Sequence, residues 1–266
     1  MVLFNFLTIF PELITESLNY GVVGQAIKNK YISCSVIQLR EFASDKHRSV
    51  DDKPFGGFDG MLMKPEVLGK ALEAKRHTKI LFPSPQGKPL TQTKAKELAA
   101  HDEITFLCGR YAGIDQRILV HYAIEEISIG DYVVSGGEWP SLIIMDAVAR
   151  HIPGVLGNQV SLDADSFSNG ILESPAFTRP QVWNDLKVPE IIVGGDHAKI
   201  KNFNEWMSLL VTLKKRPDLL ENLDPKSPLG QKWQNKSKLK EFYNQLSIED
   251  KKSCALDTME TLLNEI

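Results

Sequence analysis

Three glycine-rich turns, each after a short apolar run, are the residues best suited to hold a ligand. They are residues 84–87 (SPQG), 108–113 (CGRYAG) and 129–138 (IGDYVVSGGE). Glycine lets backbone amides and carbonyls approach a ligand closely, so turns at the ends of adjacent strands can bind a planar heterocycle through main-chain hydrogen bonds. The spacing does not fit G-x-G-x-x-G or G-x-x-x-x-G-K-[ST], which argues against dinucleotide and triphosphate cradles.

The elements that position these turns are predicted to form an α/β domain with a largely parallel sheet. Short apolar runs alternate with helical patterns up to about residue 160, which is typical of this fold class. We predict strands over residues 3–9, 32–39, 80–82, 104–107 and 124–129, and helices over residues 65–76, 91–100, 115–122 and 140–150. Thr91 and Asp115 are the predicted N-caps of two of these helices.

A small, mainly helical domain is predicted to follow. We expect a first domain over residues 1–160, a flexible linker over residues 161–172, rich in Gly, Ser, Asp and Asn, and a helical domain over residues 173–266. An apolar stripe predicts a helix over residues 197–213, and residues 247–250 resemble a capping box before a closing helix.

Composition indicates a cytoplasmic protein without a membrane partner. The 266 residues are 42% hydrophobic, which suffices for one large or two smaller cores. The three cysteines are odd in number and widely separated, which argues against a disulfide framework and a structural zinc site. The apolar start lacks the basic flank and cleavage site of a signal peptide and is too short to span a membrane, so we interpret it as a buried strand.

Net charge does not favour a nucleic-acid partner, because the chain carries a formal charge of −3 and phosphate contacts need clustered Lys and Arg. The average charge does not exclude local basic patches. Positive residues gather in the last third of the chain, at Lys214, Lys215, Arg216, Lys226, Lys232, Lys236, Lys238 and Lys240. The alternative for any one of these lysines is a solvated helical face.

Together, the motifs resemble the bacterial tRNA (guanine-N1)-methyltransferases of the TrmD type, within the SPOUT superfamily. The matching segments are residues 10–12, 47–52, 60–63, the three turns, and residues 152–157, 165–167, 178–180 and 216–217. The resemblance implies a parallel-sheet catalytic domain with a deep trefoil knot formed by the glycine turns. It also implies a homodimer with the active site at the subunit interface, and tRNA as the partner.

The same resemblance implies that S-adenosylmethionine binds in the knot, mainly through backbone atoms. The residues carried over are Pro85, Gln86, Gly87, Gly109, Arg110, Tyr111, Ile129, Gly130, Tyr132, Val134, Gly136 and Gly137. Core packing is the alternative for Ile129, Tyr132 and Val134. No residue is assigned to a metal, and whether Mg²⁺ is needed is left open.

The catalytic residues are assigned from the substrate's chemistry together with the resemblance. Guanine N1 carries a proton at neutral pH, so methyl transfer needs a base and a group that stabilises charge on O6. Asp165 matches the family's base, and Arg150 matches its arginine. The alternatives are a solvated aspartate in a polar linker, with Asp163 two places away, and an arginine that favours the helix dipole by about 0.3–1 kcal/mol.

RNA contacts are expected from two regions. The loop over residues 47–63 supplies His47, Arg48 and Asp52, and the second domain supplies Lys199, Lys201, Lys214, Lys215 and Arg216. The chain departs from the family pattern at three places: Phe58-Asp59 stands for Gly-Pro, Ala112 for Glu, and Phe203-Asn204 for Trp-Arg.

The implied reaction is methylation of N1 of the guanosine just 3′ of the anticodon, at tRNA position 37. Exposing an inner loop base costs a few kcal/mol that RNA contacts must offset. Two alternatives stay open: a knotted methyltransferase for another RNA position or base, and a non-catalytic RNA-binding module, which the Ala112 departure favours.

Overall fold

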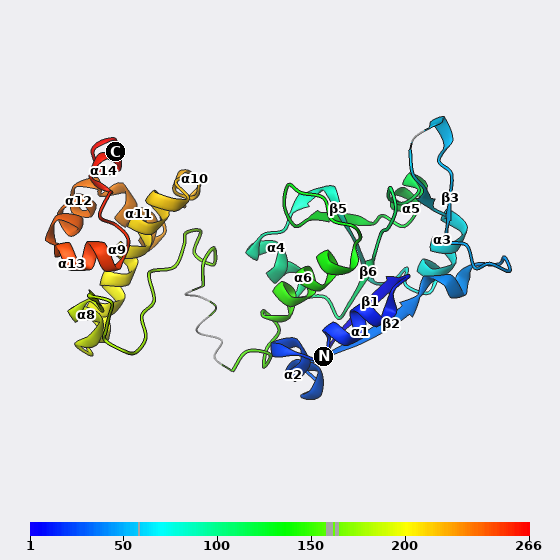
Figure 1. Ribbon diagram of the computed structural model, residues 1–266, viewed down its shortest axis with the longest axis horizontal. Helices are drawn as coiled ribbons and strands as arrows, with labels where there is room; N and C mark the ends of the chain where they lie inside the picture. The colour runs from blue at the N-terminus through cyan, green and yellow to red at the C-terminus, as the bar shows by residue number, and fades with distance from the viewer. Residues whose placement is uncertain (58, 158–161, 163–164) are drawn as a thin grey trace. The chain divides into compact units, whose positions relative to one another are not determined.

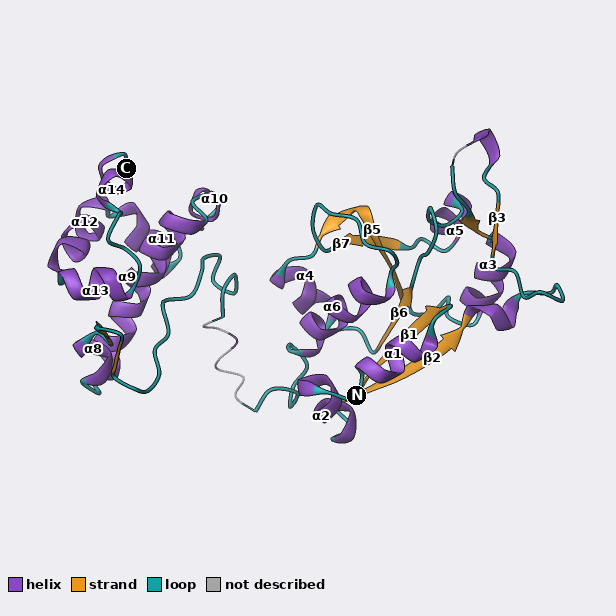
Figure 2. Cartoon of the chain, viewed as in Figure 1, coloured by secondary structure: helices purple, strands orange, loops and turns teal. Residues whose placement is uncertain are grey.

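The computed structural model describes residues 1–57, 59–157, 162 and 165–266. The chain divides into two compact units, Met1–Gln159 and Val160–Ile266, each described here by itself. Figure 2 shows the main sheet in the first unit and mostly helices in the second. Of the predicted linker 161–172, residues 161, 163 and 164 lie outside the described part of the chain.

A 5-stranded sheet with the order β2-β1-β6-β5-β7 forms the centre of the first unit. The strands are β1 (Val2–Thr8), β2 (Ile32–Gln38), β5 (Lys79–Pro89), β6 (Glu103–Leu107) and β7 (Glu125–Ser128). Every neighbouring pair is parallel, which confirms the predicted α/β class with a parallel sheet. Strands buried on both faces need apolar side chains on both faces, which explains the continuous apolar runs of the sequence.

Helices cover both faces of this sheet. They are α1 (Pro11–Ser17), α2 (Gly21–Lys28), α3 (Pro65–Glu73), α4 (Gln92–Leu98), α5 (Gln116–His121) and α6 (Glu138–Ala149). Figure 1 shows α4 and α6 on one side of the strands and α3 and α5 on the other. The predicted caps are in place: Thr91 Oγ1 accepts from Lys94 N at 3.1 Å, and Asp115 Oδ1 accepts from Arg117 N at 2.9 Å.

The core of the first unit lies in two layers, one on each face of the sheet. Phe6 and Phe106, whose ring centroids are 5.1 Å apart, pack with Ile144 of α6 on one face. Leu7 and Leu68 belong to the cluster on the other face. Because each fully buried side chain of this size contributes about 1.5–3 kcal/mol, these layers fix the sheet whose strand ends carry the glycine turns.

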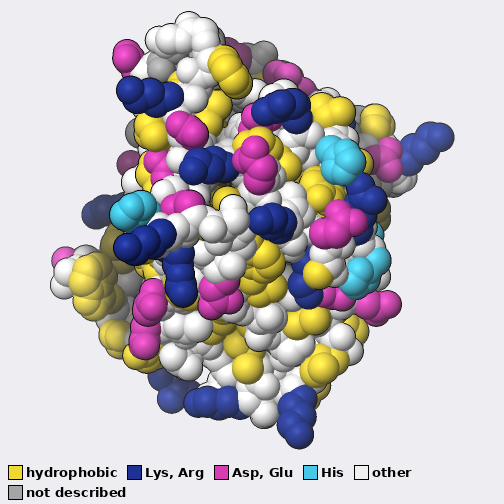
Figure 3. All heavy atoms as spheres, turned by 90° about the vertical axis from the view of Figure 1, so that its right-hand side faces the viewer, with side chains coloured by type: hydrophobic (Ala, Val, Ile, Leu, Met, Phe, Trp, Pro, Cys, Tyr) yellow, Lys and Arg dark blue, Asp and Glu magenta, His cyan; other side chains and the backbone are white. Residues whose placement is uncertain are grey.

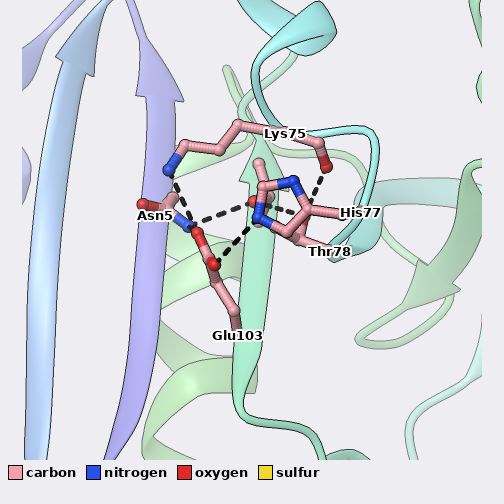
Figure 4. A network of polar contacts seen from close by, with 6 residues as sticks. Asn5, Lys75, His77, Thr78 and Glu103 are labelled. Carbon is pink, nitrogen blue, oxygen red and sulfur yellow. Dashed lines mark hydrogen bonds and ion pairs between the residues drawn. The ribbon is translucent and has the colours of Figure 1, made fainter.

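A polar network surrounds Glu103, the first residue of β6 (Figure 4). Asn5 Nδ2 donates to Glu103 Oε1 at 2.8 Å and to Thr105 Oγ1 at 3.2 Å. Lys75 Nζ lies 3.0 Å from Glu103 Oε1, and His77 Nε2 lies 3.3 Å from Glu103 Oε2. Glu103 therefore joins β1 and β6 to the segment that leads into β5.

The second unit is built around α9 (His197–Lys215), with Asp196 Oδ1 accepting from Ala198 N and Lys199 N at 3.1 Å as its cap. The other elements are β8 (Val182–Trp183), β9 (Leu186–Lys187), α8 (Glu190–Val193), α10 (Asp218–Glu221), α11 (Pro228–Gln234), α12 (Lys236–Gln245), α13 (Ile248–Ser253) and α14 (Glu260–Asn264). Ser247 Oγ accepts from Asp250 N at 2.9 Å, which confirms the predicted cap of the closing helix.

The described part of the predicted linker is anchored to the second unit. Ile171 is buried in that unit's core, and Leu172 N donates to Thr212 Oγ1 of α9 at 3.0 Å. Phe167 N donates to Ile171 O at 2.8 Å, which closes a turn directly after Asp165. Within the described ranges, no helix is long and apolar enough to cross a membrane. All three cysteines are free thiols.

Candidate functional site

The three glycine turns lie together around a cavity of about 410 Å³. Residues 84–87 lie at a register shift inside β5, and the other two turns follow the carboxyl-terminal ends of β6 and β7. Parallel strands present these ends at one edge of the sheet, where ligands of α/β proteins bind. The predicted cofactor residues that line the cavity are Pro85, Gln86, Gly109, Arg110, Tyr111, Ile129, Gly130, Tyr132, Val134, Gly136 and Gly137. Gly87 lies outside this lining, and a Cβ there would meet the backbone of Ile127 and Glu126.

The second and third turns are in direct contact. Gly137 N donates to Gly109 O at 2.8 Å. A Cβ on Gly137 would lie 2.7 Å from Gly109 N and 2.9 Å from Cys108 Cα, which is closer than side chains tolerate. Glycine is therefore needed at position 137 because two backbone segments touch there. The predicted trefoil knot would place its crossing in this region, and it stays a prediction.

A buried carboxylate holds this contact in place. Glu138, the first residue of α6, has no exposed surface. Its Oε1 accepts from Thr8 Oγ1 at 2.7 Å, and its Oε2 accepts from Arg110 Nε at 2.8 Å. A buried charge is tolerated when it is paired and hydrogen-bonded, as it is here. The carboxylate thus joins the end of β1, the second turn and the start of α6.

Arg110 extends the same connection to the cavity. Its Nη1 donates to Ser135 O at 3.2 Å, and its guanidinium lies 4.5 Å from the centroid of the Phe10 ring. A Cβ on Gly136 would collide with the Arg110 side chain. Sequence reasoning assigned Arg110 to the cofactor but missed Glu138 and Thr8. The available signal was an acidic residue at the start of a helix directly after two glycines.

The loop that starts near residue 47 is fastened to the second turn. Its base is the antiparallel pair β3 (Asp51–Asp52) and β4 (Leu62–Met63). Ala112 N donates to Met61 O at 2.9 Å, and Met63 N donates to Gly113 O at 3.0 Å. The departure residue Ala112 lines the cavity, and residue 58 of the other departure lies outside the described residues.

Tyr111 faces the same loop. Burial raises the pKa of its hydroxyl, the nearby Asp51 carboxylate raises it further, and Arg40 opposes this effect. The side chains of His47, Arg48 and Asp52 are exposed, so the structure places these predicted RNA contacts at the surface. Figure 3 shows the side of the first unit that lies at the right of Figure 1, where basic and acidic side chains are interspersed.

The predicted catalytic residues belong to different units. Arg150 forms the C-cap of α6 in the first unit, where its backbone N donates to Asp146 O at 3.2 Å. Asp165 lies in the second unit, where its backbone O accepts from Ser168 N at 3.2 Å. Both are partly exposed. Their pairing at a substrate stays a prediction, and the alternative Asp163 lies outside the described residues.

The predicted RNA contacts of the second unit differ in their partners. Lys214 Nζ donates to Ala255 O at 2.6 Å, and the Arg216 guanidinium donates to both carboxylate oxygens of Asp218 at 2.9 and 2.7 Å. Lys201 and Lys215 are exposed, and Lys199 forms an exposed ion pair of 3.5 Å with Asp196. Lys214 and Arg216 thus have roles inside the fold.

Comparison with known proteins decides the family. Residues 2–222 match the model of the tRNA (Guanine-1)-methyltransferase TrmD family. The chain belongs to this family. Similar proteins include the tRNA (guanine-N(1)-)-methyltransferase of Rickettsia typhi, 44% identical over 82% of this chain and 97% of that protein. The proteins of the same name from Staphylococcus epidermidis RP62A and Agrobacterium fabrum are 44% and 46% identical, over 82% and 81% of this chain and 90% and 94% of their own lengths.

Family membership accounts for the glycine turns and for the parallel sheet that carries them. The matched segment contains the whole first unit except Met1, and in the second unit it extends through α9 and α10. Residues 223–266, which include α11 to α14, follow the matched segment. Among the described residues, no group of three or more His, Cys, Asp or Glu side chains is placed to hold a metal ion.

Proposed function

We propose that the protein is an S-adenosylmethionine-dependent tRNA (guanine-N1)-methyltransferase that acts on the guanosine just 3′ of the anticodon, at position 37. The observation that carries the proposal is the cavity lined by the three glycine turns, in a chain of the TrmD family. The first unit would hold the cofactor and the second would bind tRNA. A tRNA substrate would place the enzyme in the cytoplasm.

The cavity fits the proposed cofactor in size and in lining. Its volume of about 410 Å³ lies in the range of about 300–1,000 Å³ for small-molecule sites. Ile129 and Val134 supply apolar walls for an adenine ring, and the turns around Gly109 and Gly137 present backbone polar groups. When bound, the cofactor supplies an electrophilic methyl group on its sulfonium sulfur. The protein's task is to orient it and exclude water.

The proposed chemistry of the protein concerns one proton and one developing charge. Asp165 would accept the proton from guanine N1, which makes N1 a competent nucleophile. Arg150 would donate a hydrogen bond to O6, where negative charge develops as the proton leaves.

A homodimer is part of the proposal, because the start of α6 exposes large apolar side chains. Trp139 is 54% exposed and Ile143 is 49% exposed, and the two lie one helical turn apart. Apolar residues grouped in this way commonly mark interfaces. A second copy of the chain packed on this face would lie beside Pro140, which lines the cavity.

The loop next to the cavity is the proposed contact for the anticodon loop. Hydrogen bonds from Ala112 N and to Gly113 O fix the base of this loop beside the second turn. His47, Arg48 and Asp52 are proposed to contact the RNA there. Phe55, which is 94% exposed, adds an aromatic ring of the kind on which unstacked RNA bases pack.

Steady-state kinetics of two variants tests these assignments. Asp165→Asn and Arg150→Lys should lower kcat by about 10²–10⁴, the contribution of a positioned acid or base, with little change in S-adenosylmethionine affinity. Asp257→Asn, an exposed carboxylate in the second unit, serves as the matched control and should retain wild-type kcat. Wild-type kcat in Asp165→Asn would remove it as the base, and cofactor binding without any turnover in the wild type would favour the RNA-binding module.

A further inference from the structure

A basic segment of the second unit lies beyond the part of the chain that matches the family. The match ends at residue 222, and residues 225–240 then contain five lysines and no aspartate or glutamate. The R. typhi relative is matched over 97% of its length but over only 82% of this chain, which leaves most of residues 223–266 without a counterpart there. Most of this segment therefore lies outside the alignment with that relative.

The fold places this basic segment against α9. Lys232 of α11 binds Asn202 Oδ1 at 2.7 Å and Glu205 Oε2 at 2.5 Å, and its Nζ lies 5.0 Å from the centroid of the Trp206 ring. Phe242 of α12 packs edge-on against Phe203 at 5.6 Å. Figure 1 shows α11 and α12 beside α9. The segment is thus anchored next to the first turns of α9, which carry Lys199 and Lys201.

Apart from Lys232, the lysines of the segment have no acidic partner among the described residues. Ion pairs hold Lys187, Lys199, Arg216 and Lys232. Among the described residues, Lys226, Lys236, Lys238 and Lys240 form none, and Lys226 and Lys238 are exposed. Like charges without neutralising partners repel one another and attract a polyanion.

Trp233 lies among these cations and is partly exposed. Lys236 Nζ lies over the Trp233 ring, and burial lowers the pKa of Lys236 to about 8. Lysines interleaved with an aromatic ring are typical of surfaces that follow an RNA backbone. A nearby phosphate would favour the charged form of Lys236, because an opposite charge raises the pKa of a lysine.

We propose that residues 226–240, together with Lys199 and Lys201, form a surface that binds the phosphate backbone of the tRNA substrate. The inference rests on the proposed function for the identity of its partner. It assigns tRNA binding to a segment outside the family match and to the first turns of α9. The carboxyl end of α9 contributes less, because Lys214 and Arg216 bind groups of the protein itself.

The test is the salt dependence of tRNA binding by the full chain, measured by fluorescence anisotropy with an unmodified transcript and no methyl donor. The variant Lys226→Gln/Lys238→Gln removes two exposed charges that form no ion pair among the described residues. The slope of log Kobs against log salt should become shallower by about 1.4–1.8, since each phosphate contact contributes about 0.7–0.9. The tRNA KM should rise, with kcat and cofactor affinity unchanged.

The control is Lys28→Gln/Lys252→Gln, which neutralises one exposed lysine in each unit. It should keep the wild-type slope, and thermal melts should show that both variants are folded. A slope and Kd equal to the control's in Lys226→Gln/Lys238→Gln would overturn the proposal. The binding assay is independent of methyl transfer. If the variant binds tRNA more weakly but the wild type has no methyltransferase activity, only the proposed function is contradicted. If the wild type is active but the variant binds tRNA normally, only this surface is contradicted.

Discussion

Replacing Glu138 by alanine removes the buried carboxylate that joins Thr8 to Arg110. The variant leaves Arg110, whose side chain is only 17% exposed, without its acidic partner. Glu138→Gln keeps the size of the side chain but loses its charge. Glu97→Ala is the matched control, because Glu97 is 58% exposed and pairs with Lys94 on the surface.

The expected magnitudes follow from burial. Breaking a buried ion pair by removing one partner costs about 3–5 kcal/mol. Because Arg110 is partly exposed, the expected loss of unfolding free energy in Glu138→Ala is about 3 kcal/mol. Glu138→Gln should cost about 1–2 kcal/mol, since a charge-assisted hydrogen bond is replaced by a neutral one. Glu97→Ala should stay within about 0.5 kcal/mol.

The assay is urea unfolding, monitored by hydrogen–deuterium exchange in peptides from β1 and α6. It reports the free energy of unfolding of the first unit. Isothermal calorimetry gives the Kd of S-adenosylmethionine. Because Arg110 also binds Ser135 O, releasing it should free the third turn and weaken cofactor binding about tenfold. A loss in Glu138→Ala no larger than in Glu97→Ala would refute the reasoning about the buried pair, and an unchanged Kd would refute its link to the cavity.

Three further outcomes are expected. Gly137→Ala should abolish cofactor binding in calorimetry, because its Cβ would lie 2.7 Å from Gly109 N, whereas Gly157→Ala, where a Cβ meets nothing within 4 Å, should bind normally; equal affinities would contradict the close approach. Burial raises the pKa of Glu103, but the hydrogen bonds from Asn5 and Lys75 together lower it by more, so the net pKa lies below its usual value of 4.5. Glu103 therefore stabilises the fold above that pH and loses this contribution as pH falls, so in acid denaturation followed by circular dichroism Glu103→Gln should lose stability less steeply than wild type; parallel curves would contradict the assignment. Burial raises the pKa of Cys34 and of Cys254 to about 12, so iodoacetamide at pH 8 should label these thiols slowly until urea unfolds the chain, and rapid native labelling detected by mass spectrometry would contradict their burial.

The main sheet of the first unit could be predicted because most of its strands are short apolar runs, and three of the strands carry or lead into glycine turns. The caps Thr91 and Asp115 were also visible in the sequence, since each precedes a helical pattern. The helices α1 and α2 were missed. Neither Phe10 nor Tyr20 makes a side-chain cap, and such short helices are stabilised by packing against the sheet, which local patterns do not reveal.

The site was predictable where it depends on backbone turns and not where it depends on contacts distant in sequence. The spacing of glycines indicated the cavity lining directly. The buried link from Thr8 to Glu138 joins residues 130 positions apart. Only the sheet order brings β1 next to β6, which leads into the second glycine turn. Gly87 was predicted as a ligand contact, and its place outside the lining follows from the close approach of β5 and β7.

The most direct test of the central claim is methyl transfer at a single atom. Purified protein, labelled S-adenosylmethionine and two tRNA transcripts, one with guanosine and one with adenosine just 3′ of the anticodon, would be incubated and the nucleosides identified by mass spectrometry. The account predicts 1-methylguanosine from the first transcript alone, and its loss in Asp165→Ala. Methylation of another base, equal methylation of both transcripts, or cofactor binding with no product would contradict it.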